Sequence, residues 1–156
     1  MPNDEARPKV DALTRLVLAI FRTNGELLAA GDLLVAPMGL SSARYQVLGA
    51  VALSAEPLTV PGIARAMGLT RQGVQKQVDL LVAQGLLALR ENPEHRRSAH
   101  VRLTSAGQRA FANADRRWRR LARRLVAEQS LGALERAGAL VASLGAALGT
   151  PSGGAS

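Results

Sequence analysis

The chain has 156 residues, of which 47% are hydrophobic, and it contains no cysteine. This length fits one domain, and the missing thiol excludes disulfide frameworks, cysteine nucleophiles and cysteine-ligated metal sites. Lysine and arginine together number 20 against 12 acidic residues, which leaves a formal charge of +8. All but two of these cations are arginine, the residue suited to forked phosphate contacts, so a polyanionic partner is expected.

The N-terminal part of the chain is predicted to be a short flexible segment followed by a helix. Residues 1–10 contain Asp4, Glu5 and two prolines and lack the basic-then-apolar layout of a secretory signal, which favours a cytoplasmic protein. Apolar residues then recur at three- and four-residue steps over residues 11–36, the pattern of an amphipathic helix. The pair Asn24-Gly25 leaves open whether that helix is continuous.

A pair of short helices is predicted in the middle of the chain. After Pro37-Met38-Gly39, Ser41 or Ser42 is expected to cap a helix that ends near Leu53. Thr59 and Thr70 are expected to cap two further helices, which end at Gly68 and Gly85. Two compact helices with a glycine in the joint between them are typical of a helix-turn-helix unit.

After Gly85 the hydrophobic period changes from about 3.6 to about 2, which predicts two short strands. Leu87 and Leu89 alternate in the first strand, and residues 99, 101 and 103 alternate in the second. The polar loop at residues 92–98 separates them and carries the adjacent cations Arg96 and Arg97. The segment is therefore predicted to be a hairpin with a basic tip.

Two helices are predicted to complete the chain. Thr104 is expected to cap the first, which has a narrow apolar stripe and, on the other side, an arginine face within residues 109–124. We interpret that face as solvated rather than as a phosphate contact. A last helix is predicted at about 131–148, and residues 149–156 are predicted to be a disordered tail. The apolar run after Ala137 has about 12 apolar residues, too few for the roughly 20 that a bilayer demands.

The second short helix presents residue types that read bases. With Val74 at the centre of the buried stripe, Gln72, Gln75 and Lys76 project to the opposite side. Glutamine can bind adenine across its N6 and N7 edge, and lysine can reach guanine O6 and N7 or a phosphate. Arg71 lies in the first turn, where backbone N–H groups also face phosphate. The alternative is a merely solvated helix face.

The hairpin strengthens the DNA interpretation because it follows the helix pair directly. Arg96 or Arg97 is expected to enter a narrow minor groove, with Arg90 and Arg102 near the flanking phosphates. The alternative is a solubilising surface turn. The predicted DNA-contacting residues are Thr70, Arg71, Gln72, Gln75, Lys76, Arg90, Arg96 and Arg97.

Over nearly its whole length the chain resembles the MarR-type winged-helix transcriptional regulators. The resemblance rests on Gly39-Leu40-Ser41, Leu69-Thr70-Arg71-Gln72 and, most specifically, Asn92-Pro93-Glu94-His95-Arg96-Arg97 leading into Leu103-Thr104-Ser105-Ala106-Gly107. The chain departs from the family at His95, where an aspartate usually braces the wing arginines. The brace is then either Glu94 or a weaker one. A second departure is Gly73, where a small hydroxyl residue is common.

The resemblance implies a mainly α fold with a small β-hairpin wing, in which N- and C-terminal dimerisation helices flank a winged helix-turn-helix. One domain is expected at 11–148, with the winged helix-turn-helix at about 40–104 and the dimerisation helices at about 11–36 and 105–148. The resemblance also implies a homodimer that binds a pseudo-palindromic operator in double-stranded DNA, commonly as a repressor. Release by a small aromatic or anionic effector is a family property, and Tyr45 and Trp118 are the candidate ligand residues.

Two other classes of protein were weighed against a DNA-binding regulator. An enzyme is disfavoured because no nucleophile elbow, P-loop, dinucleotide fingerprint or zinc-protease motif occurs, and no cofactor is expected. No metal site is expected either, since His95 and His100 are the only histidines and both lie on the wing. The remaining alternative is a cationic helical adaptor that binds a protein or an anionic surface, which leaves the hairpin unexplained.

Overall fold

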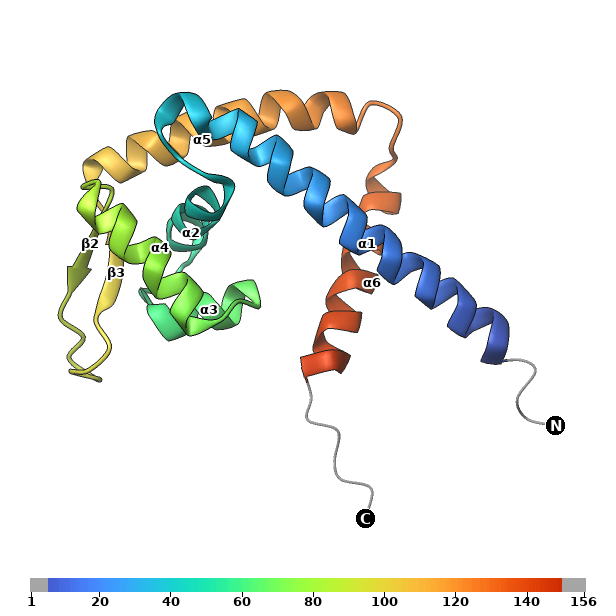
Figure 1. The fold of residues 1–156 in the computed structure, drawn as a ribbon, viewed down its shortest axis with the longest axis horizontal. Coiled ribbons are helices and arrows are strands. Elements are labelled where there is room, and N and C mark those ends of the chain that lie inside the picture. Colours follow the sequence, from blue (N-terminus) through green and yellow to red (C-terminus); the bar gives the residue numbers. More distant parts are fainter. Residues whose placement is uncertain (1–5, 150–156) are drawn as a thin grey trace, which may run out of the picture. The chain divides into compact units, whose positions relative to one another are not determined.

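The computed structural model describes residues 6–149, so predictions made for residues 1–5 and 150–156 lie outside the described range. The elements are α1 (Ala6–Val35), the 3₁₀ turn η1 (Ala36–Met38), α2 (Ser42–Leu53), β1 (Leu58–Thr59), α3 (Val60–Met67), α4 (Arg71–Ala83), β2 (Leu87–Arg90), β3 (His100–Leu103), α5 (Ser105–Leu125) and α6 (Leu131–Gly149) (Figure 1). The mainly helical fold with a small antiparallel sheet is confirmed. The chain divides into two compact units, with the boundary between Arg117 and Trp118.

Helix α1 is longer and more regular than the sequence indicated. It begins at Ala6, five residues before the start that was expected at residue 11. Pro8 is compatible with this start because the first turn of a helix needs no N–H donor from it. The helix also runs unbroken through Asn24-Gly25, which settles the question of a break there.

The predicted helix caps of the central region are confirmed. The hydroxyl oxygen of Ser41 accepts from the backbone N–H of Arg44 at 3.3 Å, and those of Thr59 and Thr70 accept from the third residue after each at 3.2 and 3.1 Å. Gly68 and Gly85 end their helices with φ values of 64° and 70°, a conformation that costs glycine little. Residues close in sequence therefore determine where α2, α3 and α4 begin and where α3 and α4 end.

The hydrophobic core lies between α2, α3, α4 and the hairpin. Val74, Val78 and Leu81 of α4 are fully buried. They pack in one cluster with buried residues of the neighbouring elements, among them Val47, Leu48, Ile63, Leu87 and Val101. Because three residues of α4 at four- and three-residue spacing enter this core, the rotation of α4 about its own axis is fixed.

The sheet has three strands in the order β1-β3-β2. Strands β2 and β3 form the predicted hairpin, with Leu87 opposite Leu103 and Arg90 opposite His100. Strand β1 was not predicted from the sequence. It has only two residues, and Leu58 pairs with Val101 on β3. A strand this short shows no alternating pattern, so only its pairing reveals it.

The base of the hairpin is bound to the start of α5 through Thr104. Its backbone N–H donates to the Leu86 carbonyl at 3.1 Å, and its hydroxyl donates to the Gly85 carbonyl at 2.6 Å. The same hydroxyl oxygen accepts from the N–H of Gly107 at 3.0 Å, which confirms Thr104 as a cap. Gly107 is buried against Leu86, and a Cβ atom at this glycine would overlap the Leu86 carbonyl oxygen.

The wing loop is braced by Asn92, whose side chain is only 5% exposed. Its Oδ1 accepts from the N–H groups of Glu94 and His95 at 3.1 and 3.3 Å, and its Nδ2 donates to the Ser98 carbonyl at 3.0 Å. Of the two alternatives expected from the sequence, a Glu94 brace or a weaker one, the first had assigned the role to the Glu94 carboxylate, whereas Glu94 takes part here through its backbone N–H. A buried carboxamide therefore holds the loop that carries Arg96 and Arg97.

The unit that begins at Trp118 contains α6, whose bounds match the predicted helix to within one residue. This helix is long and apolar enough to cross a membrane by length and composition, with a mean hydropathy of 1.3 and none of that window buried. The sequence argument counted apolar residues only from Ala137, while the helix starts at Leu131. Length and composition alone do not separate a membrane helix from one that another protein surface covers.

We predict that Gly107→Ala lowers the free energy of unfolding by about 2 to 3 kcal/mol, because the added methyl group must displace the Leu86 carbonyl. Denaturant unfolding measures this change. Gly49→Ala is the matched control, since its Cβ would meet Phe111 of α5 at 3.5 Å, an ordinary van der Waals contact. Equal stabilities of the two variants would contradict the close packing at Gly107.

We predict that Asn92→Ala speeds amide hydrogen exchange at Glu94 and His95 by about tenfold or more, because both N–H groups lose a buried acceptor. Exchange measured by NMR tests this. Glu94→Ala is the control, and it should leave the His95 amide as protected as in the wild type. The reverse pattern, with a loosened loop only in Glu94→Ala, would return the brace to the glutamate.

Candidate nucleic-acid interface

The predicted reading residues of α4 all lie at the surface. Thr70, Arg71, Gln72, Gln75 and Lys76 are exposed, whereas the apolar stripe on the opposite side of the helix is fully buried. Thr70 also serves as the N-cap of α4, and a hydroxyl that accepts a cap hydrogen bond keeps one O–H to donate. The first turn of α4 thus offers backbone N–H groups, a hydroxyl and the Arg71 guanidinium on one side.

Gln75 has a partner within its own helix. Its Nε2 donates to Oδ1 of Asp79, one turn further along, at 2.7 Å. This bond uses one of the two amide hydrogens and leaves Oε1 and the second hydrogen for a base edge. The sequence analysis placed Gln75 on the reading face and did not foresee the pairing, although the i, i+4 spacing could have indicated it.

The structure brings α4 and the wing together at a cleft of about 500 Å³. Arg71, Gln72 and Gln75 line it from α4, and Arg97 lines it from the wing. The rest of the lining consists of Val60, Pro61, Leu89, Ser98 and Ala99. Four of the eight predicted contact residues therefore border one concave surface, although they lie up to 26 positions apart in the sequence.

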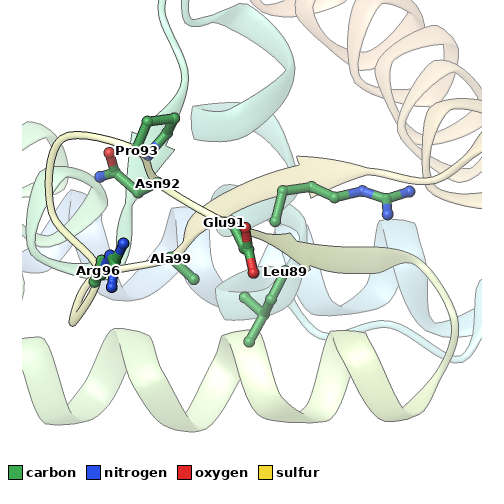
Figure 2. Close-up of a pocket in the computed structure, with 7 residues that line it drawn as sticks. Leu89, Glu91, Asn92, Pro93, Arg96 and Ala99 are labelled. Carbon is green, nitrogen blue, oxygen red and sulfur yellow. The ribbon is translucent and has the colours of Figure 1, made fainter.

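A second and larger cavity, of about 790 Å³, lies in the wing itself (Figure 2). Arg90 and Arg96 line it, together with Leu89, Glu91, Asn92, Pro93 and Ala99. Figure 2 shows Asn92 and Arg96 on the inside of the loop's curve. The adjacent residues Arg96 and Arg97 therefore border different cavities, which the sequence alone did not separate. Leu89 and Ala99 border both.

The charge of this region is positive. Residues 60–103 contain seven arginine or lysine residues and three acidic residues. Lys76, Arg90, Arg96, Arg97 and Arg102 are all exposed, so their charges act on the solvent side. An exposed surface of this kind attracts polyanions through long-range electrostatics.

The two candidate ligand residues lie in different compact units. Tyr45 is half-buried and stacks on Phe111, with ring centroids 6.1 Å apart and an interplanar angle of 27°. Trp118 is 38% exposed and begins the second unit. Their role toward an effector stays a prediction. Within residues 6–149, no three or more potential His, Asp or Glu ligands gather in a way that could hold a metal ion.

The arginine face of α5 is exposed at every predicted position. These residues are Arg109, Arg116, Arg117, Arg119, Arg120, Arg123 and Arg124. Exposure is what a solvated face requires, and it is equally what a contact surface requires. The interpretation as a solvated face therefore stays a prediction.

Comparison with known proteins gives a consistent result. The model of the MarR family matches residues 38–98. Proteins of Mycobacterium tuberculosis and Mycobacterium bovis, both named as uncharacterised, are 44% identical over 101 residues, which is 65% of this chain and 69% of each relative.

Solved structures show the same fold. CouR of Rhodococcus jostii RHA1, bound to p-coumaroyl-CoA, is 25% identical, with a TM-score of 0.75 over 83% of this chain and 90% of that chain. The regulator BldR of Sulfolobus solfataricus is 21% identical, with a TM-score of 0.78 over 86% of this chain and 97% of BldR. The M. tuberculosis regulator MosR, solved in complex with DNA, is 21% identical with a TM-score of 0.71, and covers 86% of this chain and 98% of MosR.

The family model covers α2, the helix pair and most of the wing loop, and it includes the motifs at residues 39–41, 69–72 and 92–97 on which the resemblance in sequence rests. The chain belongs to the MarR family of winged-helix transcriptional regulators.

Proposed function

We propose that the protein is a sequence-specific regulator of transcription that binds double-stranded DNA as a homodimer on a pseudo-palindromic operator. One observation carries this proposal: the polar face of α4 and Arg97 of the wing border one exposed, basic cleft. The alternative of a cationic adaptor gives no reason for that convergence. The DNA complex of MosR, which has the same fold, supports it by analogy.

Helix α4 is the element that reads the major groove, which is wide enough for one helix. Gln72 and Gln75 carry amides that pair with the N6 and N7 edge of adenine, and Lys76 suits guanine O6 and N7 or a phosphate. Arg71 and the Thr70 hydroxyl lie at the N-terminal end of α4, where the helix dipole also favours a phosphate. Phosphate contacts thus position the helix, and the amides specify the sequence.

The wing supplies a second contact in the neighbouring groove. Arg96 or Arg97 enters the minor groove, where narrow A·T-rich segments have an enhanced negative potential. Arg90 borders the same cavity as Arg96 and binds a flanking phosphate. The Asn92 brace lowers the entropy lost when this loop settles on DNA, because the loop is already ordered by three side-chain hydrogen bonds.

A homodimer accounts for the apolar surface of α1 and α6. Val10, Phe21 and Leu28 of α1 are 58%, 70% and 38% exposed, and at 100° per residue they fall within about 20° of one line along the helix. On α6, Leu131 and Leu148 are 71% and 86% exposed. A second copy of the chain would cover such surfaces, and its two-fold axis would place the two α4 helices about one DNA turn, roughly 34 Å, apart.

Regulation and location follow from the family. Repression is the common outcome of such binding, and we extend it to this protein, which we place in the cytoplasm where its operator lies. Since CouR was solved with p-coumaroyl-CoA, a small aromatic or anionic effector that releases DNA is part of the proposal. Tyr45 and Trp118 are the residues proposed to meet it. We propose no catalytic activity.

The central test selects bound duplexes from a random pool and then compares variants on the selected operator. We expect Gln75→Ala and Lys76→Ala each to weaken operator binding by about 1 to 3 kcal/mol, with smaller effects on random DNA, because each removes a base contact. Arg65→Ala is the control: Arg65 is an exposed cation of α3 that borders neither cavity, so operator preference should persist.

Wild-type affinity for the operator should also fall by about three decades or more between 50 and 200 mM salt if about 6 to 10 phosphates are engaged. A steep salt dependence without any sequence preference would favour the adaptor instead.

We expect Phe21→Ser to raise the dissociation constant of the homodimer roughly thirtyfold or more, the effect of losing an aromatic residue worth about 2 kcal/mol at an interface. Sedimentation over a concentration series measures this constant. Leu53→Ser is the matched control because Leu53 is also exposed, at 79%, but lies at the end of α2. Equal dissociation constants for both variants would remove α1 from the interface.

A further inference from the structure

The corner between α1 and α2 contains a hydrogen bond that joins two different helices. The backbone N–H of Ser42, the first residue of α2, donates to Oδ1 of Asp32 on α1 at 2.6 Å. Figure 1 shows α1 turning through η1 into α2 at this point. All of these elements belong to the unit that ends at Arg117. The bond therefore connects α1, which carries the exposed apolar stripe, to α2. Helix α2 is the first helix of the reading head, which we define as residues 42–103.

The two helices also approach too closely at this corner for a side chain on α1. A Cβ atom at Gly31 would lie 2.5 Å from Oγ and 3.1 Å from Cβ of Ser42. Ser42 is 6% exposed, and its Oγ accepts from Nε2 of Gln46 at 3.2 Å. Val35, the last residue of α1, is fully buried. The two helices are thus in close contact at Gly31 and Ser42, while Asp32 itself is exposed.

Helix α2 does not need Asp32 in order to begin. Ser41 already caps it, with its Oγ accepting from the N–H of Arg44 at 3.3 Å. The Asp32 carboxylate adds a second acceptor, which reaches the same helix end from ten residues earlier in the chain. A carboxylate at a helix N-terminus is favourable, but its placement on α1 also restrains the angle between the two helices.

We propose that Asp32 is a positioning residue that sets the angle between α1 and the reading head, and thereby the half-site spacing that the homodimer accepts. This inference rests on the proposed function. In the dimer, α1 is held by the partner, and the reading head is connected to it through this corner. Adding one base pair between half-sites shifts a site by about 3.4 Å and rotates it by about 35°, so a rigid corner makes the wrong spacing costly.

The test measures binding to three duplexes: the operator selected by the wild-type protein, and versions with one base pair removed from or added to its centre. We expect the wild type to prefer its own spacing. Asp32→Ala should reduce this preference about tenfold, the factor that one charge-assisted hydrogen bond is worth. Asp32→Asn should reduce it less, because the amide oxygen still accepts from Ser42. Glu26→Ala, which removes another exposed carboxylate of α1, should behave like the wild type.

Several controls keep the outcomes distinct. Circular dichroism and sedimentation should show that Asp32→Ala stays folded and dimeric, since Ser41 still caps α2. An unchanged spacing preference in a folded Asp32→Ala dimer would overturn the inference while leaving the proposed function intact. If Asp32→Ala does not fold, Asp32→Leu decides, because leucine has nearly the shape of aspartate and no acceptor for the Ser42 N–H: a reduced preference supports the inference and an unchanged one overturns it. Failure of the wild type to prefer any sequence would instead refute the proposed function, and the inference with it.

Discussion

The burial of Val74, Val78 and Leu81 is the constraint on which the reading surface depends. All three are fully buried, and each contributes about 1.5 to 3 kcal/mol by leaving water. A rotation of α4 about its axis by one residue, about 100°, would expose this stripe and carry Gln75 toward the core. The Gln75 amide would then lose its hydrogen bonds to water, which is unfavourable. The outward direction of the polar face therefore follows from how the opposite face packs. The polar side chains of α4 need no unusual backbone conformation to face solvent, because the packing of the opposite face orients the helix.

The wing depends on the same core. Leu87 and Val101 anchor its two strands in the central cluster, and Thr104 ties the base of the hairpin to the turn after α4 and to α5. Only the tip needs its own support, which Asn92 supplies from a buried position. Helix α4 and the wing thus pack on the same hydrophobic core. This explains how residues from separate segments come to border the same cleft.

Features set by neighbouring residues were predictable from the sequence, and features set by distant ones were not. The caps at Thr59 and Thr70 and the ends at Gly68 and Gly85 involve partners within a few positions, so spacing and residue type sufficed. The exposure of the polar face of α4 followed from its periodicity in the same way. Strand β1, the convergence of α4 with the wing and the bond from Asp32 to Ser42 depend on how distant segments pack, which no local pattern contains. The Asn92 brace is local, but charge does not mark it, because a buried position favours a neutral amide over a carboxylate such as Glu94.

The protein thus combines a well-packed winged helix-turn-helix, a helix α1 that we propose to pair with a second copy, and a hydrogen-bonded corner between them. Methylation interference on the selected operator shows which groove each element enters, because dimethyl sulfate marks guanine N7 in the major groove and adenine N3 in the minor groove. We expect blocked binding at N7 positions in two patches about one helical turn apart, with N3 positions affected beside each patch. Binding that tolerates N7 methylation throughout the operator would contradict this expectation, because α4 would then not lie in the major groove.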